Sequence, residues 1–393
     1  MKLIPDNFID EIYYRISRVK EIMKQNNLNA LLIGSNANLY YLSGRFFRGY
    51  IYIPVEGEVF WFVIKPQIFS EEEKVIYVRK PEEILSILEK KDLPVPSNIG
   101  LEENDLSYSD IIRLKNIFKE SSLENASLIM KKSRMVKTDW EIAEMKDDGY
   151  HHANVYSKIK DCYKPGMTDL RLQIEIEKHL RLEGSLGVSR VSGNLMEINL
   201  GSVISGDNAD NPAPYEFTMG GAGVHPALPV GADDSIILQG QTVMIDMNGA
   251  FNGYQTDMTR VWCLGEIPEI AKKAHECSIR ILRTLEEKSV PGSPVKDMYT
   301  IAIDIVKEDG LEQYFMGHNS QVGFIGHGVG IQLNELPVLM AKSKDILEKN
   351  MTLAIEPKFV IPHIGAVGVE NTYVVTDKGL ENITVFPEKI EKF

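Results

Sequence analysis

Four carboxylate side chains in the second half of the chain follow or interrupt short apolar runs of the kind that form buried strands. They are Asp246 after Val243-Met244-Ile245, Asp257 eleven residues later, Glu356 after Leu353-Ala354-Ile355, and Glu370 after Gly368-Val369. A carboxylate inside a buried strand costs free energy unless it is paired. Four that lie within a few Å of one another cannot all ionise without cations, because each negative charge raises the pKa of the others. The pattern therefore points to bound cations.

The spacing of the first two aspartates predicts that their side chains share one face of a β-hairpin. Asn252-Gly253 is a strong signal for a two-residue turn, which would pair Asp246 with Thr259. Asp257 is two residues from Thr259, so the two aspartates would be diagonal neighbours about 7–8 Å apart at Cα. A three-residue loop would place them on opposite faces. With the shorter turn, both side chains can reach the same ion.

His327 supplies a nitrogen ligand to this set. It lies in the run Gly-His-Gly-Val-Gly at 326–330, where the glycines allow a close approach of the backbone. Taken singly, each of these residues has an ordinary explanation: an aspartate can be held by backbone amides or by Arg260, a glutamate by a salt bridge, and histidines are common in loops. Together, oxygen ligands with one imidazole suit Mn, Co, Fe or Zn, and two divalent ions would balance four carboxylates.

The elements that must position these residues begin with an alternation of helices and strands in the first third of the chain. Helical spacing of apolar residues predicts helices over Phe8–Lys24, Pro81–Lys90 and Ser109–Lys119, and apolar runs predict strands at Ala30–Gly34 and Val59–Ile64. This alternation predicts an α/β domain. The segment 131–134 is polar, and we place the end of the domain at residue 132.

The remaining segment, 133–393, repeats one pattern of two helices separated by Pro-Gly. Thr138 and Glu141 have the spacing of a capping box and begin a helix to about Lys160, and a second helix covers Asp169–Glu183. A later pair begins near residue 268 and ends near residue 310. The Pro-Gly pairs at 165 and 291 and the glycines at 184 and 310 are each 126 residues apart. We infer an internal duplication, with a site at the junction of its halves.

Composition excludes several classes of function. The chain has 393 residues and a net charge of −13, so neither nucleic acid nor an anionic membrane surface is the expected partner. Its 3 cysteines are too few and too scattered for a disulfide framework. Neither a signal peptide nor a membrane-spanning run is recognisable, and the expected location is the cytoplasm.

The five candidate ligands and their surroundings resemble the metal pentad of the pita-bread metallopeptidases, which include Xaa-Pro aminopeptidase, prolidase and methionine aminopeptidase, with creatinase as a relative. The likeness rests on the Asp–Asp spacing, on Gly-Tyr-x-x-Asp-x-Thr-Arg at 253–260, on Gly-His-Gly-Val-Gly, and on Ile-Glu-Pro at 355–357. Four further segments of this chain, at 41–44, 137–141, 165–166 and 205–206, resemble the two-domain prolidase and creatinase branch of the family. The resemblance covers nearly the whole chain.

This resemblance implies an α/β N-terminal creatinase-like domain over 1–132 and an α+β pita-bread catalytic domain with internal duplication over 133–393. It also implies a homodimer, a small peptide or other small amide as substrate, and two divalent metal ions. Manganese is the expected metal, with cobalt, zinc or iron as alternatives. The implied ligands are Asp246, Asp257, His327, Glu356 and Glu370. In such a dinuclear hydrolase, a hydroxide bridging the ions attacks the amide bond before proline, Asp257 bridges both ions, and Glu356 also accepts a proton.

Several positions depart from the pattern of the family. Asn334 replaces a histidine found seven residues after the ligand histidine, Gly323 replaces another, and Gly368 stands where proline-specific members usually have arginine. His225 lies a few residues away from the position of an upstream histidine of the family. These departures put the peptidase activity in question, because the replaced residues bind substrate and transfer protons in the family.

Proton transfer to the leaving nitrogen therefore needs another donor. The candidates are His225, His318 and His363, and Asn334 could hydrogen-bond a substrate carbonyl or oxyanion. We predict these four as substrate-binding residues, and we predict His225 and Asn334, with Glu356, as catalytic ones.

Two other functions compete with an Xaa-Pro aminopeptidase or dipeptidase. The replaced histidine and arginine positions favour a non-peptidase metalloenzyme on the same fold, such as a creatinase-like C–N hydrolase or a lyase. A binding protein that has lost catalysis is the other alternative, and the five intact ligands count against it.

Overall fold

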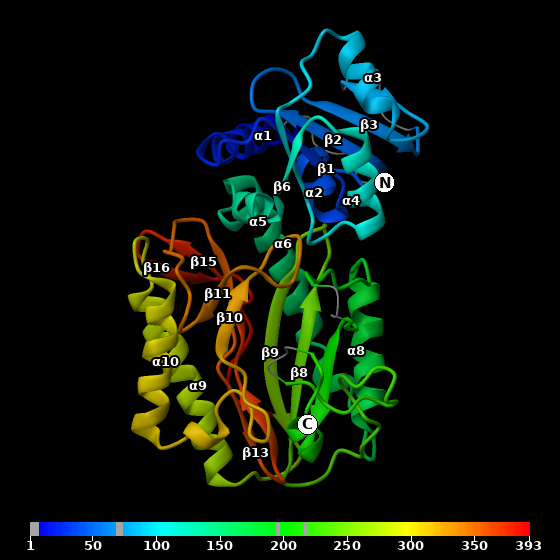
Figure 1. Ribbon diagram of the computed structural model, residues 1–393. Helices are drawn as coiled ribbons and strands as arrows, with labels where there is room; N and C mark the ends of the chain where they lie inside the picture. Colours follow the sequence, from blue (N-terminus) through cyan, green and yellow to red (C-terminus); the bar gives the residue numbers. More distant parts are fainter. Residues whose placement is uncertain (1–7, 68–73, 194–196, 216–218) are drawn as a thin grey trace. The chain divides into compact units, whose positions relative to one another are not determined.

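The computed structural model describes residues 8–67, 74–193, 197–215 and 219–393, and it is shown in Figure 1. The chain divides into two compact units, the first ending at Arg134 and the second beginning at Met135. The expected boundary after residue 132 lies inside helix α5 (Ser127–Met135). The polar residues 131–134 therefore belong to the last turns of a helix instead of a linker.

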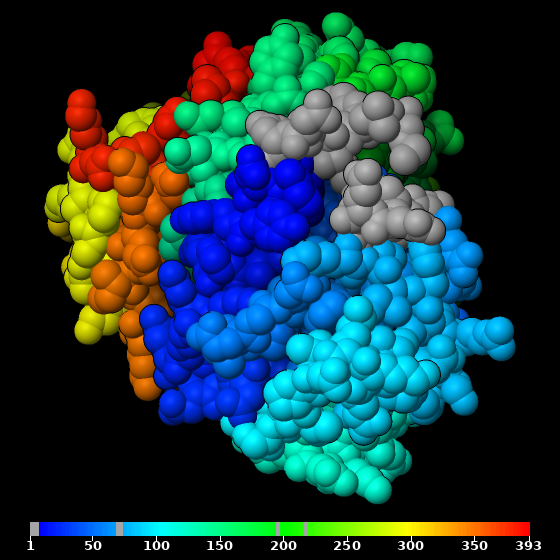
Figure 2. Space-filling model, turned by 90° about the horizontal axis from the view of Figure 1, so that it is seen from above, coloured from blue at the N-terminus to red at the C-terminus, as the bar shows by residue number. Residues whose placement is uncertain are grey.

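The first unit is an α/β domain, as the alternation of helices and strands predicts. Its elements are α1 (Phe8–Gln25), β1 (Ala30–Ile33), α2 (Asn36–Ser43), β2 (Arg48–Pro54), β3 (Phe60–Lys65), β4 (Val75–Tyr77), α3 (Glu83–Lys90), β5 (Asn98–Leu101), α4 (Tyr108–Ile117), β6 (Ser122–Asn125) and α5. The strands form one sheet in the order β4-β3-β2-β1-β5-β6. Because β1 pairs with β5, segments from the start and the end of the unit, blue and cyan in Figure 2, lie next to each other.

The second unit carries the candidate ligands on strands that lie between helices. Its elements are α6 (Asp139–Tyr156), α7 (Ile159–Cys162), α8 (Asp169–Glu183), β7 (Gly201–Ser205), η1 (Gly206–Asp210), β8 (Thr242–Gly249), β9 (Thr256–Cys263), α9 (Glu269–Lys288), α10 (Val295–Asp309), η2 (Glu312–Tyr314), β10 (Phe324–Gly328), β11 (Glu335–Met340), β12 (Thr352–Ile355), β13 (Lys358–Ile361), β14 (Gly365–Gly368), β15 (Asn371–Thr376), β16 (Gly379–Asn382) and β17 (Glu391–Lys392). The sheets have the orders β17-β9-β8-β7, β11-β10-β12-β15-β16 and β13-β14. In Figure 1, α9 and α10 lie on one side of these strands and α8 on the other.

Two matching helix pairs confirm the internal duplication. Helices α8 and α10 have 15 residues each, and both of their ends are 126 residues apart in the sequence. Each ends at a glycine with positive φ, Gly184 at 114° and Gly310 at 64°, which relieves the steric cost of the left-handed conformation. The capping box of Thr138 and Glu141 is present at the start of α6. That helix ends at Tyr156, four residues before the predicted end, and α7 follows as a separate turn.

The β8–β9 hairpin has the predicted register but a longer loop than predicted. Asp246 pairs with Thr259, yet the ladder ends at Gly249 and Thr256, so the two-residue turn at 252–253 is wrong. The connecting residues bond to other segments: Asp148 accepts from the amide of Phe251, and the Asn252 side chain donates to the carbonyl of Glu144. These contacts replace the last rungs that a tight turn would have formed.

Apolar side chains from α9 and α10 pack against the strands and form the larger core of the second unit. It includes Ile281 and Leu285 of α9, Ala302 and Val306 of α10, and Leu353 of β12. This packing fixes the strands that hold the candidate ligands. Within the described part of the chain, every helix is too short or too polar to cross a bilayer.

Candidate metal centre

The five predicted ligands come from five segments of the second unit and converge on one place. Asp246 lies in β8, Asp257 in β9 and His327 in β10, while Glu356 follows β12 and Glu370 precedes β15. Nε2 of His327 lies 4.0 Å from Oδ2 of Asp257 and 3.7 Å from Oε1 of Glu356. We call these five residues the acidic cluster.

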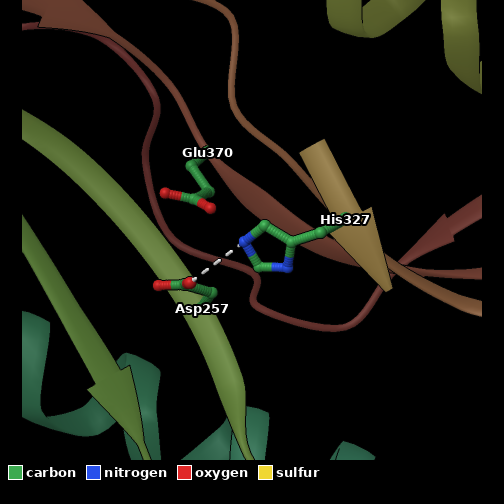
Figure 3. Close-up of side chains that lie close together, drawn as sticks. All are labelled: Asp257, His327 and Glu370. Atoms are coloured by element: carbon green, nitrogen blue, oxygen red, sulfur yellow. Dashed lines mark ion pairs between the residues drawn. The ribbon is translucent and has the colours of Figure 1, made fainter. Parts of the chain in front are cut away.

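Three members of the cluster have the geometry of a cation site. One ligand atom each of Asp257, His327 and Glu370 lies within 4.8 Å of the other two, and Figure 3 shows the three side chains facing one another. Oδ1 of Asp257 and Oε1 of Glu370 are buried and have no hydrogen-bond partner. Buried acceptors are normally satisfied. The two acids with an unsatisfied oxygen and the imidazole belong to the same group of three residues, and this group therefore fits one divalent cation.

The imidazole of His327 is oriented for this role by its own strand. Its Nδ1 lies 3.0 Å from the carbonyl oxygen of Gly328, which can only accept, so Nδ1 carries the proton. In the neutral ring, Nε2 then keeps its lone pair and faces Asp257 and Glu356. A backbone carbonyl that fixes the tautomer in this way is typical of metal-binding histidines.

Lys358 is a member of the site that the sequence analysis missed. Its Nζ donates to Oδ2 of Asp246, Oε2 of Glu356 and Oε2 of Glu370, each at 2.8 Å. The side chain is fully buried. A signal was present in the sequence, because Lys358 is two residues after Glu356, and side chains two apart in an extended segment point to the same face.

The pKa values of the cluster reflect burial of several acids together. Burial, and then the charges of Glu370 and Asp246, hold the pKa of Asp257 well above its usual range. Burial also raises the pKa of Glu370 to about 8, while Lys358 opposes the shift. Burial alone would lower the pKa of Lys358, but the nearby carboxylates outweigh it and keep that pKa well above its usual range. Such shifts arise where negative charge exceeds positive charge, as at a site built for cations.

Backbone and hydroxyl contacts anchor two of the buried acids, Asp257 and Glu370. Thr259 and Glu370 exchange backbone hydrogen bonds, and the Thr259 hydroxyl donates to Oε2 of Glu370 at 2.7 Å. The backbone amide of Asp257 donates to the hydroxyl of Thr372 at 2.8 Å. Arg260, considered above as a partner for an aspartate, instead donates to the backbone carbonyls of Thr259 and Glu370. It therefore fixes the position of Glu370 through the main chain.

The four residues predicted to bind substrate make contacts of their own elsewhere. His225 is exposed, and its Nδ1 accepts from the amide of Ala227. Two others pair with aspartates of η1: Nδ1 of His318 is 2.9 Å from Oδ2 of Asp210, and Nδ1 of His363 is 3.3 Å from Oδ2 of Asp207.

The side-chain amide group of Asn334 links its own segment to the backbone of Ser192. Its Oδ1 accepts from the amide of Ser192 at 2.6 Å, and its Nδ2 donates to the carbonyl of the same residue at 2.9 Å. Both polar atoms of Asn334 are thus occupied by the main chain of Ser192.

Two family models match the chain and together cover most of it. The model described as metallopeptidase family M24 matches residues 143–377, and the creatinase/prolidase N-terminal domain matches residues 15–136. The first match includes all five residues of the acidic cluster, as well as Lys358.

Curated proteins and solved structures match nearly end to end. The chain is 28% identical over 376 residues to the Xaa-Pro dipeptidase of Pyrococcus furiosus. The match covers 94% of this chain and 97% of that protein. The prolidase structure from Pyrococcus horikoshii has a TM-score of 0.78 at 24% identity and covers 96% and 99% of the two chains. The X-Pro aminopeptidase structure from Thermotoga maritima has a TM-score of 0.77 at 20% identity, covering 95% and 100%. The two structures share the two-domain fold described above.

Proposed function

Because the chain belongs to metallopeptidase family M24, we propose that it is a metal-dependent dipeptidase that hydrolyses the amide bond of Xaa-Pro dipeptides. One observation carries the proposal: the half-buried imidazole of His327 lies among carboxylates, and two of these, Asp257 and Glu370, each have a buried oxygen without a hydrogen-bond partner. We choose a dipeptidase over an aminopeptidase because the curated protein matched along 94% of this chain is an Xaa-Pro dipeptidase. The relatives are peptidases, and a creatinase-like or lyase activity is therefore not favoured.

The residues proposed to hold metal belong to the acidic cluster. Asp257, His327 and Glu370 form its most compact part. A divalent ion at such a site lowers the pKa of water towards neutrality and polarises a carbonyl. We propose manganese, with cobalt, zinc and iron as alternatives, because carboxylate oxygens predominate among the ligands.

Glu356 is the proposed proton acceptor. One of its oxygens lies 3.7 Å from His327, and the other accepts from Lys358 at 2.8 Å. The ammonium group holds the carboxylate in one orientation, which positions it as a general base. The proton donor to the leaving nitrogen stays a prediction, with His225, His318 and His363 as candidates. For Asn334, we propose a positioning role through Ser192, because both of its polar atoms are occupied there.

The proposal is tested by removing metal from the full-length protein with a chelator and restoring Mn²⁺, Co²⁺ or Zn²⁺ in turn. We expect hydrolysis of Ala-Pro after restoration of metal, with little hydrolysis of Ala-Ala or of a longer peptide with proline at its second position. Creatine serves as the substrate for the alternative function. Failure to cleave Ala-Pro with any of the ions, or cleavage of creatine, would overturn the proposal.

Two further expectations belong to this proposal. A small peptide is the proposed partner of the site, and a homodimer is the proposed assembly, which light scattering can test. The cytoplasmic location stays a prediction from the sequence.

A further inference from the structure

The ammonium group of Lys358 uses oxygens that a second metal ion would need. A lysine ammonium has three N–H donors, and Nζ of Lys358 has three acceptors at 2.8 Å: one oxygen each of Asp246, Glu356 and Glu370. Its donors are thus fully used by three of the five predicted metal ligands. A cation in hydrogen-bond contact with these oxygens repels a second cation that approaches them.

The ligand atoms that remain belong to a different part of the cluster. Oδ1 of Asp257 and Oε1 of Glu370 are without a hydrogen-bond partner, and Nε2 of His327 carries its lone pair towards Asp257. These three residues form the compact cation site described above. The cluster is therefore divided between the acceptors of Lys358 and the compact cation site, and Glu370 belongs to both.

Charge balance no longer requires two ions. The cluster has four carboxylates, and the ammonium of Lys358 offsets one of their charges. A single divalent ion offsets two more and leaves a net charge of −1. Surrounding hydrogen bonds can stabilise this remaining charge. Four acids in one cluster need two divalent ions only when the lysine is left out.

The neighbouring strand lies close to the backbone that carries Lys358. Gly368 of β14 pairs with Lys358 of β13. A Cβ atom at position 368 would lie 2.6 Å from the carbonyl oxygen of Pro357, 2.9 Å from Cα of Lys358 and 3.3 Å from its Cγ. Gly368 also has a φ of +143°, which favours glycine. The glycine therefore allows the two strands to approach closely at the point where Lys358 enters the site.

We propose that Lys358 takes the place of one of the two metal ions and that the cluster binds a single divalent ion on Asp257, His327 and Glu370. In this arrangement, Asp246 is a partner of Lys358 and not a metal ligand. The inference rests on the metal dependence in the proposed function, but it concerns the number of ions and which residues bind them.

The first test counts ions in the wild-type protein. The chelated protein is reloaded with Mn²⁺, freed of unbound ions, and measured by elemental analysis and electron paramagnetic resonance. We expect one Mn²⁺ per chain and the six-line spectrum of an isolated ion. Two Mn²⁺ per chain, or the broad spectrum of a coupled pair, would overturn the inference.

The second test separates the two parts of the cluster with Asp246→Asn. Its oxygen can still accept from Lys358, so the fold should persist, and we expect the Mn²⁺ content to stay at one per chain. A loss of half or more of the bound Mn²⁺ would show that Asp246 is a ligand and would contradict the inference. This test does not depend on any variant of Lys358.

The third test removes the ammonium with Lys358→Ala, and Lys358→Arg is the matched control that keeps a cation. We expect two Mn²⁺ per chain in the alanine variant, one in the arginine variant, and one again in the double variant Lys358→Ala/Asp246→Asn. A folded alanine variant with a single ion would overturn the inference; circular dichroism checks the fold of each protein. A wild type with one ion that fails to cleave Ala-Pro would instead contradict only the proposed function.

Discussion

Glu102 in the first unit and Glu370 in the second are both buried glutamates, but their oxygens have different surroundings. Both oxygens of Glu102 are satisfied: Oε2 accepts from the amides of Gly34 and Ser35, and Oε1 accepts from the side chains of Ser35 and Asn38. Gly34 and Ser35 lead into α2, and Asn38 lies in its first turn. Glu102 thus holds one loop in place and has no capacity left for a ligand.

Glu370 has one satisfied oxygen and one that lacks a partner. Its Oε2 accepts from Thr259 and Lys358, whereas Oε1 is buried without a hydrogen bond. Three further acids lie close by. Burial of an acid is therefore not what distinguishes a site from a structural contact. The distinguishing feature is an excess of acceptor oxygens and negative charge over the donors that the protein supplies.

The largest effect expected from this contrast follows from Asp257→Asn. The substitution keeps the size of the side chain and removes a charge from the compact cation site, while Thr372 still holds the backbone of residue 257. We expect loss of bound Mn²⁺ and a fall in kcat/KM of at least about 100-fold, since even changes to partners of metal ligands cost about 10–100-fold. Elemental analysis and assays with Ala-Pro measure the two effects. Full metal content in this variant would contradict the assignment of Asp257 as a ligand.

The opposite result is expected from Glu102→Ala, which should reduce stability without affecting metal. Four donors would lose their acceptor, at about 1–3 kcal/mol for each buried group, and we expect a loss of roughly 5 kcal/mol in the free energy of unfolding of the first unit. Urea unfolding measures this loss, and the Mn²⁺ content per folded chain should stay at the wild-type value.

The adjacent exposed acid provides the matched control for this variant. Glu103→Ala should leave the free energy of unfolding close to that of the wild type, because Glu103 is exposed. Equal losses in the two variants would show that the four hydrogen bonds of Glu102 do not carry the effect.

The sequence was sufficient for features that depend on local spacing. The helix over Asp169–Glu183 is confirmed at both ends, because its N-cap threonine and terminal glycine lie next to it in the chain. The pairing of Asp246 with Thr259 is also confirmed, since the alternation of the two strands restricts their register. The two-residue turn was wrong because the loop bonds to α6, and such a distant partner leaves no mark on the loop sequence.

Distant contacts also explain why Lys358 was missed. Its three acceptors come from segments up to 112 residues away, and only the fold brings them together. In the sequence, Lys358 begins an apolar run and resembles the edge of a strand. Asn334 was identified as a departure from the family, but its pairing with Ser192, 142 residues away, could not be inferred from spacing.

A smaller effect is expected at Asp148, a buried acid intermediate between Glu102 and Glu370. It accepts from the amide of Phe251 at 2.5 Å and from the hydroxyl of Thr256 at 2.8 Å. With two donors and no lysine, it favours the protonated form more than an exposed acid does: burial raises its pKa to about 7. Asn at this position would mimic that form, since its oxygen can accept from Phe251 and its amide can donate to Thr256.

The substitution Asp148→Asn should therefore flatten the dependence of stability on pH. Because the folded pKa of about 7 is above the ordinary value of 3.8 for an aspartate, the group favours folding fully below pH 4, and that contribution is lost as the pH rises through 7. Removing the titration should reduce the loss of stability between pH 4 and pH 7 by up to about 4 kcal/mol, at about 1.4 kcal/mol per pKa unit. Urea unfolding of both proteins at several pH values, with Mn²⁺ present to keep Asp257 and Glu370 ionised, measures the difference. Identical slopes in the two proteins would mean that Asp148 is already ionised at neutral pH and that its two hydrogen bonds, like the four of Glu102, are enough to hold the charge.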